Sequence, residues 1–498
     1  MTEEKPSDSN TPSSTPWFSR LGPALITACV VIGPGSILTS SNVGAVNGYG
    51  LSWVVAVAVV FMLTYMSMGA RLGVSIKQSA GTLVAERIGR WFAILIGISV
   101  FFISAAFQFG NNLGVHYAIA TYIDFDYAVV IFNALAIGFL LFFKNMYKAL
   151  EKLMMIFVGV MLVAFLVNLL MAGPRFGEWA QGFVPGAAGK FDLSVLGLVG
   201  TTFVTTAAFY QAYLVRQKGL TAKEVQHGMI DVRIGATVMA AITLMLMATP
   251  ATLYYPIFQY QQVVTSDNDA GLPPGTSLVI DESDPNFTEH RQRAESEMNW
   301  KVDEKTNKRE PRWTKIVEKA EFEKKYQEPY GIKTAPRSFR DLPEVGTGLK
   351  PFFGTIGPPL FFLGVFAAAY SSFLVNSMIG GFILADGLGI GAKPEDKWPK
   401  IFTIAVLLTG MFVGLYVITV MKLQRPVTLI VMAQAVTVIA SPIIAGTLLW
   451  MSSSKDIMGE NKNGPVTLTL GVIGFVLLLA MSARTATSVV PKIMAMFS

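Results

Sequence analysis

Charged side chains are scarce in this sequence: only 14% of its 498 residues are Asp, Glu, Lys or Arg, whereas 52% are hydrophobic. Soluble domains carry about 25% charged residues, so this composition excludes an ordinary soluble protein and indicates a chain that lies in lipid. A bilayer core about 30 Å thick requires roughly 20 apolar residues per spanning helix. Eleven stretches meet this requirement, at residues 20–40, 51–76, 91–122, 127–144, 150–172, 194–216, 230–258, 351–386, 398–421, 425–451 and 465–489.

Cysteine and histidine are also nearly absent. The single cysteine, Cys29, lies in the first apolar stretch, and without a partner it excludes intrachain disulfides and thiolate metal clusters. Of the three histidines, His116 and His227 have no partner at metal-ligand spacing. We therefore expect structural roles for both of them, and no bound cofactor.

The polar segments divide the chain into four regions. Residues 1–19 are rich in Ser, Thr and Pro, which predicts a disordered cytoplasmic tail. Residues 20–258 contain the first seven apolar stretches and residues 351–498 contain the last four. Between them, residues 259–350 are polar and proline-rich. This composition predicts a soluble insertion, whose mixed charges between Glu289 and Tyr326 favour one or two surface helices.

Lysine and arginine are distributed unevenly over the loops between the apolar stretches. Short loops rich in these residues stay in the cytoplasm, which predicts a multi-pass cell-membrane protein with a cytoplasmic N-terminus and an extracytoplasmic insertion. The net charge of +6 follows from this loop bias and does not indicate nucleic-acid binding. The residues placed in the cytoplasm are Arg71, Lys77, Arg87, Arg90, Lys144, Lys148, Lys152, Arg216, Lys218, Lys223, Arg233, Lys393, Lys397, Lys400, Lys455 and Lys462.

Two apolar stretches contain residues that interrupt helices. The first holds Gly33-Pro34-Gly35, in which the glycines weaken a helix and the proline removes an amide donor. The sixth holds a run of small and β-branched residues from Gly200 to Ala208. Carbonyls freed at a mid-membrane break can form a cation site, and breaks in helices one and six are typical of transporters built from two inverted five-helix repeats. A simple proline kink is the alternative at Pro34.

Several segments resemble the Nramp family of divalent-metal transporters. Gly22-Pro23 through Gly33-Pro34-Gly35-Ser36 to Trp53 resembles the family's first helix and following loop without a gap. The resemblance implies the fold class: an all-α integral membrane protein of about 11 transmembrane helices, with LeuT-like inverted five-helix repeats and helices 1 and 6 broken at mid-membrane. Further matches, in the family's order, are Ala70-Arg71-Leu72-Gly73, Leu150-Glu151, Ser371-Ser372, Gln434 with Pro442, and Ile457-Met458-Gly459 with Asn461.

The chain departs from the family pattern at the metal site and the proton route. The family's Asp-Pro-Gly-Asn motif reads Gly33-Pro34-Gly35-Ser36 here, so a carboxylate is lost and an amide becomes a hydroxyl. Its Met-Pro-His motif aligns with Val204-Thr205-Thr206, or with Ala207 at the methionine position in an alternative register. Its helix-three acids align with Gln108 and Asn111. By this resemblance the metal site consists of Gly33, Ser36, Thr201, Val204, Thr205, Ala207 and Gln434.

These departures leave hard, neutral oxygen atoms around the ion. Loss of the thioether removes the preference for softer metals, and Mg²⁺ is a hard ion that usually keeps several waters. The pattern resembles the bacterial Nramp-related magnesium transporters. It implies a transporter rather than an enzyme: a monomer that imports Mg²⁺, and also Mn²⁺, across the cytoplasmic membrane by alternating access at a midplane site, without proton coupling.

Two other functions remain open from the sequence. A carrier of another small solute on the same fold would use the first break for a carboxylate and Na⁺, but has no reason to share Gln434 or Ile457-Met458-Gly459. A transport-inactive membrane receptor would use residues 259–350 for signalling. Such modules usually signal from the cytoplasm, whereas this insertion is predicted outside. Metal import is therefore the favoured hypothesis.

Overall fold

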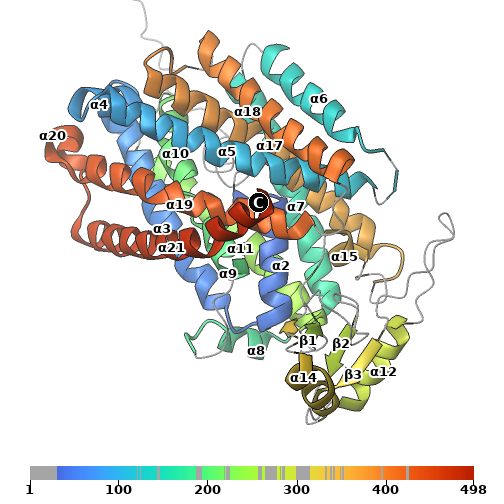
Figure 1. The fold of residues 1–498 in the computed structure, drawn as a ribbon. Helices are drawn as coiled ribbons and strands as arrows, with labels where there is room; N and C mark the ends of the chain where they lie inside the picture. The colour runs from blue at the N-terminus through green and yellow to red at the C-terminus, as the bar shows by residue number, and fades with distance from the viewer. Residues whose placement is uncertain are drawn as a thin grey trace, which may run out of the picture.

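The computed structural model shows a long helical bundle with a small mixed part of helices and strands at one end (Figure 1). It describes residues 31–497 with gaps at 121, 124, 143–145, 187–192, 218, 220–224, 256–260, 264–276, 281, 283–286, 299–314, 331, 333, 337–338, 340–341, 348, 350–352, 394–395 and 422–425. The predicted N-terminal tail and Cys29 lie outside the described residues.

Nine helical segments in these ranges are long and apolar enough to cross a membrane. They coincide with the second, third and fifth to eleventh predicted stretches. Their helices are α3 (Ser52–Ser75), α5 (Arg90–Ala120), α7 (Met146–Ala172), α9 (Leu193–Thr202) with α10 (Thr205–Gln217), α11 (Val225–Leu253), α17 (Gly357–Leu388), α18 (Lys397–Leu415) with the π-helix η4 (Tyr416–Met421), α19 (Pro426–Ser453) and α21 (Pro465–Phe497).

The other two predicted stretches are shorter where the structure describes them. The fourth is α6 (Ala128–Phe142), an apolar helix of 15 residues. The first is described from Val31 onward and contains α2 (Pro34–Asn47). The total of about eleven spans therefore stays a prediction.

The outer surface of the bundle carries large apolar side chains. Phe102 on α5, Ile156 on α7, Phe412 on α18 and Val476 on α21 are each between 55% and 65% exposed. Apolar surface of this kind is unfavourable in water and marks contact with a partner or a membrane. On helices of this length and hydropathy, the covering medium is lipid, and the chain is an integral membrane protein.

The spanning helices pack in two groups. In one, α17 lies along α5 and α18, and α18 also contacts α5. In the other, α11 contacts α2 and α3, α10 contacts α3, and α9 contacts α2. Glycines permit the close contacts of the second group: Gly44 of α2 lies against the Met247 carbonyl of α11, and Gly69 of α3 lies against the Ala208 carbonyl of α10.

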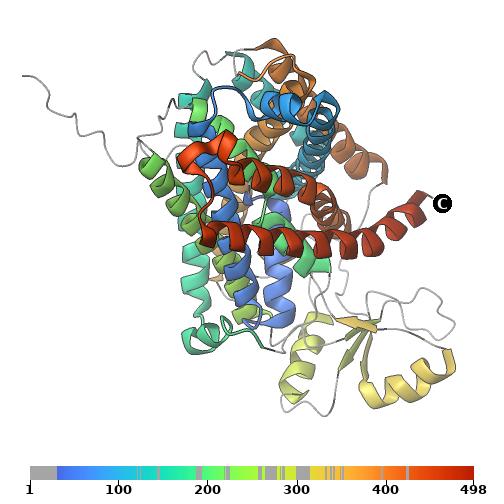
Figure 2. The same ribbon diagram turned by 90° about the vertical axis from the view of Figure 1, so that its left-hand side faces the viewer.

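The bundle has two ends, and the insertion with its strands lies at one of them (Figure 2). At the basic end, which α4 (Ala80–Arg87), α20 (Lys455–Met458) and the α17–α18 loop form, Arg71 Nη2 donates to Asn463 Oδ1 at 2.7 Å. At the insertion end, which α8 (Phe176–Gln181) and the segment between α11 and α17 form, the Tyr49 and Thr252 hydroxyls lie 2.6 Å apart. Arg71, Arg87, Arg90, Lys393 and Lys455 lie in or beside the elements of the basic end.

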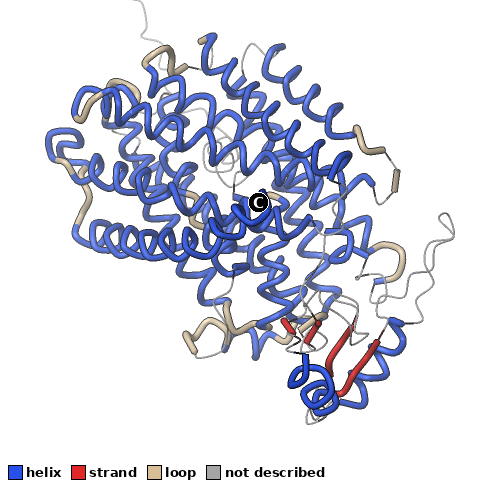
Figure 3. The backbone as a smooth tube through the Cα atoms, in the orientation of Figure 1, coloured by secondary structure: helices blue, strands red, loops and turns tan. Residues whose placement is uncertain are grey.

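The insertion folds around a four-stranded sheet, drawn in red in Figure 3. The strand order is β3-β2-β1-β4; β2 and β3 are parallel, and the other pairs are antiparallel. The helices between Glu289 and Tyr326 agree with the sequence analysis, but the sheet was not expected, because strands of three or four residues are too short to show an alternating pattern. The elements are β1 (Gln261–Val263), β2 (Ser277–Ile280), α12 (Phe287–Met298), β3 (Lys315–Glu318), α13 (Lys319–Phe322), η3 (Glu323–Gln327), α14 (Glu328–Tyr330), β4 (Thr334–Pro336) and α15 (Leu342–Thr347).

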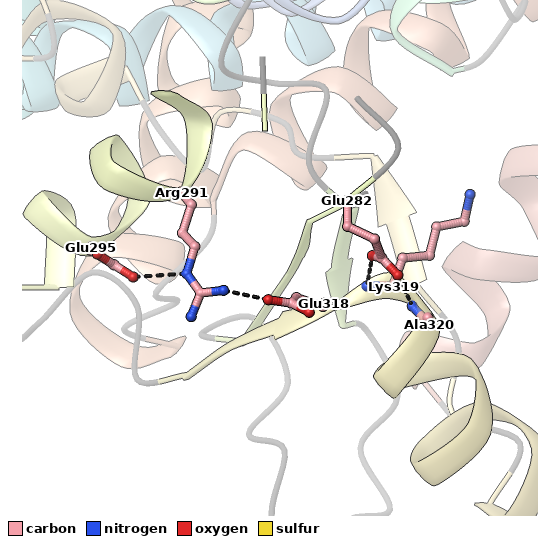
Figure 4. Close-up of polar contacts among 6 residues, drawn as sticks. All are labelled: Glu282, Arg291, Glu295, Glu318, Lys319 and Ala320. Carbon is pink, nitrogen blue, oxygen red and sulfur yellow. Dashed lines mark hydrogen bonds and ion pairs between the residues drawn. The ribbon is translucent and has the colours of Figure 1, made fainter. Parts of the chain in front are cut away.

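Polar contacts join the parts of this insertion (Figure 4). Arg291 of α12 donates to Glu295 at 3.0 Å and also pairs with Glu318 of β3. These hydrogen bonds, first that to Glu295, raise the pKa of the exposed Arg291 guanidinium. Both carboxylate oxygens of Glu282 accept from backbone amides at the start of α13, Lys319 N at 2.9 Å and Ala320 N at 3.0 Å. The contacts tie α12 and α13 to the edge of the sheet.

The last part of the insertion is docked onto the bundle. Phe339 N donates to the Asn42 side chain of α2 at 2.8 Å, and the Tyr254 hydroxyl donates to the Val345 carbonyl at 3.1 Å. Phe339, Leu342 and Val345 are buried. The described residues between Phe339 and Leu349 therefore belong structurally to the bundle, whereas the sheet lies beyond them.

We expect the outer part of the insertion to be dispensable for folding. Val263 and Thr334 already face each other in the antiparallel β1–β4 pair. Replacing residues 264–333 by Asn-Gly would connect them through a two-residue turn that suits antiparallel strands. The melting temperature of the purified variant, followed by fluorescence-detected gel filtration, should stay within a few degrees of the wild-type value.

A longer deletion provides the comparison. Removing 262–345 also removes Phe339 and Val345, so it should lower the melting temperature clearly, because buried contacts with α2 and α11 are lost. Equal stability of the two deletions would contradict the docked role of residues 339–349.

Candidate functional site

The first helix is broken at Ile32 and Gly33. Gly33 is extended, with φ −136° and ψ 178°, and Pro34 occupies the first turn of α2, where its missing amide costs nothing. The Gly33 carbonyl accepts from Ile37 N at 3.0 Å and so starts the hydrogen bonds of α2. The buried Ser36 hydroxyl donates to the Val31 carbonyl on the other side of the break. Ser36 therefore ties the two halves together.

The sixth helix is broken at Phe203 and Val204, between α9 and α10. Thr201 donates to the Leu198 carbonyl at 3.1 Å, and Thr205 to the Ser441 carbonyl of α19 at 3.5 Å. Because α9 ends here, the carbonyls of its last turn receive no hydrogen bond from a following turn of the same helix. They also carry the negative end of the helix dipole. The breaks predicted in helices one and six are both confirmed.

Gln434 of α19 lies between these elements. A Cβ atom on Gly35 of α2 would overlap the Gln434 side chain, and one on Gly110 of α5 would lie 3.1 Å from Gln434 Nε2. A Cβ atom on Gly200 of α9 would lie 2.6 Å from the Val438 side chain and 3.4 Å from the Gln434 backbone carbonyl. Gly35 and Gly110 thus make room for the Gln434 amide side chain. Its Oε1 is buried and has no hydrogen-bond partner among the described residues, which is costly unless a ligand or water supplies one.

Two further side chains face the break from α5 and α17. A Cβ atom on Gly33 would lie 3.0 Å from Asn111 Oδ1 and 3.4 Å from Ser372 Oγ. Asn111 Nδ2 donates to Gln108 Oε1 at 2.7 Å, and Asn376 Nδ2 donates to Ser372 Oγ at 2.6 Å. Because Asn111 donates its nitrogen to Gln108, its oxygen is left facing Gly33.

Sequence reasoning did not assign Asn111 or Ser372 to the site. The available signal was that polar residues in a membrane helix face the interior, but helix periodicity does not say which neighbour they meet. The structure brings Gly33, Asn111 and Ser372 together, and brings Gln434 to Gly35 and Gly200. Val204 and Ala207 are buried without a polar side-chain atom. The convergence of Ser36 and Thr205 on one cavity stays a prediction.

The polar atoms around the two breaks are neutral: backbone carbonyls, hydroxyls and carboxamides. Within the described ranges, no group of three or more His, Cys, Asp or Glu side chains could hold a metal ion. Such oxygens can accept hydrogen bonds from the waters of a hydrated cation or contact a hard cation directly. His116 lies in α5 and is buried.

Helices broken in the first and sixth positions, with polar groups at the breaks and long apolar helices around them, define the class of LeuT-like membrane proteins. Over residues 24–271 and 331–488 the chain matches the model of the Nramp family, natural resistance-associated macrophage protein-like. The chain belongs to this family. The match leaves out residues 272–330, which contain β2, α12, β3 and α13 of the insertion.

Individual relatives are distant. The divalent metal cation transporter MntH of Chromohalobacter salexigens is 24% identical over 54% of this chain and 65% of its own length. That of Deinococcus radiodurans is 26% identical over 39% of this chain and 46% of its own length. The chain thus aligns with less than two thirds of either relative. Among solved structures, the manganese transporter of Eremococcus coleocola superposes with a TM-score of 0.68 at 14% identity, covering 100% of this chain and 91% of that one.

We expect Gly35→Ala to destabilise the protein because the new methyl group overlaps Gln434, and overpacking a core typically costs about 1–3 kcal/mol. Gly159→Ala is the matched control: Gly159 is also in a helix, and nothing lies within 4 Å of its added Cβ. The control should be neutral or stabilising, by up to about 1 kcal/mol. Melting temperatures in one detergent measure both.

A double variant tests the cause. Gly35→Ala with Gln434→Ala removes the overlapping side chain and should recover much of the lost stability. A double variant that is less stable than Gly35→Ala by the full cost of Gln434→Ala alone would show that the two residues do not interact.

Proposed function

We propose that this protein imports Mg²⁺, and also Mn²⁺, across the cytoplasmic membrane as a monomer, by alternating access at the breaks of helices one and six. The observation that carries the proposal is the neutral oxygen lining of those breaks, above all the buried Gln434 Oε1 without a partner among the described residues. Family membership supports the transport of a divalent metal, and the relatives named above are divalent-metal and manganese transporters.

The chemistry of the lining favours a hydrated ion. Mg²⁺ binds its waters at about 2.1 Å, releases them reluctantly, and usually keeps several of them in a protein. The water hydrogens point outward from the ion and require acceptors. Asn111 Oδ1 and Gln434 Oε1 are such acceptors at the first break, and they carry no charge that would draw the ion into direct contact.

The same lining explains a low preference for softer metals. The family positions that carry a carboxylate and a thioether are Gly33 and Val204 in this chain, or Ala207 in the alternative register. Without a sulfur ligand, the site has no preference for softer ions over Mg²⁺. Mn²⁺ remains a substrate, because carboxylate, carbonyl and water oxygens suit both ions.

For the orientation, we propose that the basic end faces the cytoplasm. Arg71, Arg216 and Lys455 lie in or beside short loops at that end, which is the distribution of the positive-inside rule. The N-terminus is then cytoplasmic, and the insertion is extracytoplasmic. Import runs from the insertion end to the basic end.

We expect Ser36→Asp to shift ion preference from Mg²⁺ toward Mn²⁺, because a carboxylate at the break offers a direct ligand that replaces a water. Ser36→Asn is the matched control, with the same shape and no charge. Competition of the two ions for uptake into proteoliposomes measures the preference. If Ser36→Asp and Ser36→Asn have the same Mn²⁺ to Mg²⁺ ratio as wild type, Ser36 does not contact the ion.

We also expect metal transport without proton movement. Gln108 and Asn111 align with the acidic positions of the family and hydrogen-bond each other at 2.7 Å, and a carboxamide side chain has no ionisable group that could carry a proton at neutral pH. The membrane potential suffices as a driving force, since a divalent ion gains about 4.6 kcal/mol per 100 mV.

Proteoliposomes with a pH dye inside should show metal entry without acidification, at a rate that rises with an inside-negative potential. Protein-free liposomes are the control. Acidification that requires both protein and metal would overturn uncoupled transport.

A further inference from the structure

Among the residues that the structure describes, one carboxylate is buried, and it lies at the basic end of the bundle, outside the site. Asp386, near the end of α17, is 2% exposed. Its Oδ1 accepts from the Ser79 hydroxyl at 2.5 Å and the Thr82 hydroxyl at 3.1 Å. Its Oδ2 accepts from Gly81 N at 2.8 Å and the Tyr213 hydroxyl at 2.5 Å. All four donors come from other elements: α4 with its N-cap Ser79, and α10.

These partners make the carboxylate favourable where it lies. A buried charge is costly unless it is hydrogen-bonded or paired, and the described residues give Asp386 no ion pair. Arg90 donates instead to the backbone carbonyls of Asp386 and Gly387, at 3.2 and 3.3 Å. Hydrogen bonds to a charged acceptor are about twice as strong as neutral ones, and the N-terminus of α4 adds a favourable dipole.

The local sequence is adapted to this contact. A Cβ atom on Gly81 would lie 2.6 Å from Asp386 Oδ2, so only glycine lets the carboxylate reach the backbone amide. Tyr210 and Phe382 lie one turn further into the bundle on the same two helices, with ring centroids 6.1 Å apart in an edge-to-face contact. Helices α10 and α17 thus contact each other first through an aromatic pair and then, nearer the basic end, through the carboxylate.

The carboxylate connects the two packing groups of the bundle. α17 packs along α5 and α18, and α4 contacts both α5 and α17, whereas α10 packs along α3. The hydrogen bond from Tyr213 of α10 to Asp386 therefore joins the two groups. α10 is also the half of helix six that leads from the break to the basic end. Any motion that separates α10 from α17 and α4 at this end must pull the Tyr213 hydroxyl away from Asp386 and from Gly81 N.

We propose that Asp386, with Ser79, Gly81, Thr82 and Tyr213, forms a latch that holds the basic end of the ion path closed. Opening of the path to this end breaks the latch, and the hydroxyls and the carboxylate then bind water. The proposal rests on the transport function given above, because a latch requires a path to close. Asp386 acts as a positioning residue for the helices and does not bind the ion.

The test is hydrogen–deuterium exchange of the full chain in lipid nanodiscs. Asp386→Asn keeps the shape of the side chain but replaces one acceptor oxygen by an NH₂ group. This NH₂ group faces hydroxyl or amide donors and cannot accept their hydrogen bonds, so the substitution weakens the latch. Amides of residues 79–87 and 210–217 should exchange about tenfold faster or more, because they become exposed whenever this end opens. The other spanning helices should keep the wild-type rate.

Asp396→Asn is the matched control. Asp396 also accepts from backbone amides, Ala392 N and Lys393 N at 3.0 Å each, but it does so within the α17–α18 loop. Its substitution should speed exchange only near residues 391–396. Tyr213→Phe and Ser79→Ala each remove one donor and should give a smaller effect in the same two segments, which tests the latch even if Asp386→Asn does not fold.

Two results would overturn the latch. One is wild-type exchange in residues 79–87 and 210–217 in all three latch variants. The other is faster exchange spread evenly over the spanning helices, which would assign Asp386 a general structural role. In uptake assays, the latch predicts a higher KM for the external ion in Asp386→Asn. The external ion binds to the state that is closed at the basic end, and a weaker latch lowers the population of that state. Absence of uptake by the wild type would refute the proposed function and leave the exchange result interpretable.

Discussion

A backbone amide or carbonyl without a hydrogen-bond partner costs several kcal/mol in lipid, and this constraint governs how the two broken helices are built. Each break is buried inside the bundle, where neighbouring groups replace the missing helical bonds. Ser36 binds the Val31 carbonyl across the first break, and Thr205 reaches the Ser441 carbonyl beside the second. Close packing of the surrounding helices is therefore a condition for having breaks at all, and Gly44 and Gly69 permit that packing.

The breaks in turn determine what the interior can bind. Carbonyls at the end of a half-helix attract cations, and here the side chains that join them are amides and hydroxyls. The hydrogen bonds from Asn111 to Gln108, and from Gln108 to the Phe373 carbonyl of α17, hold the amide groups of α5 in one arrangement. In the proposed transport function, such a lining interacts with the ion mainly through water, so the size and hydration of the ion decide selectivity more than direct ligand affinity does.

The two broken helices make polar contacts to other elements at both ends of the bundle. At the insertion end, the Asn42 side chain of α2 accepts from Phe339, and the family match resumes at residue 331, before this docked segment. At the basic end, Asp386 joins α17 to α4 and α10. The half-helices α2 and α10 thus each make a polar contact to another element in the half that leads away from its break. In the proposed transport function, contacts of this kind would have to break when the path opens to the corresponding side.

The sequence by itself determined the membrane class, nine of the predicted spans and both helix breaks, because hydropathy and the chemistry of Gly33-Pro34-Gly35 act locally. It also indicated that Gln434 belongs to the site, through family resemblance. Only the tertiary structure decided that Gly35 and Gly110 make room for Gln434, that Asn111 faces Gly33, and that Asp386 meets Tyr213, 173 residues away. The sequence analysis also did not predict the short strands of the insertion. Contacts of this kind depend on how helices rotate and pack against one another, and a pattern along one chain does not encode that arrangement locally.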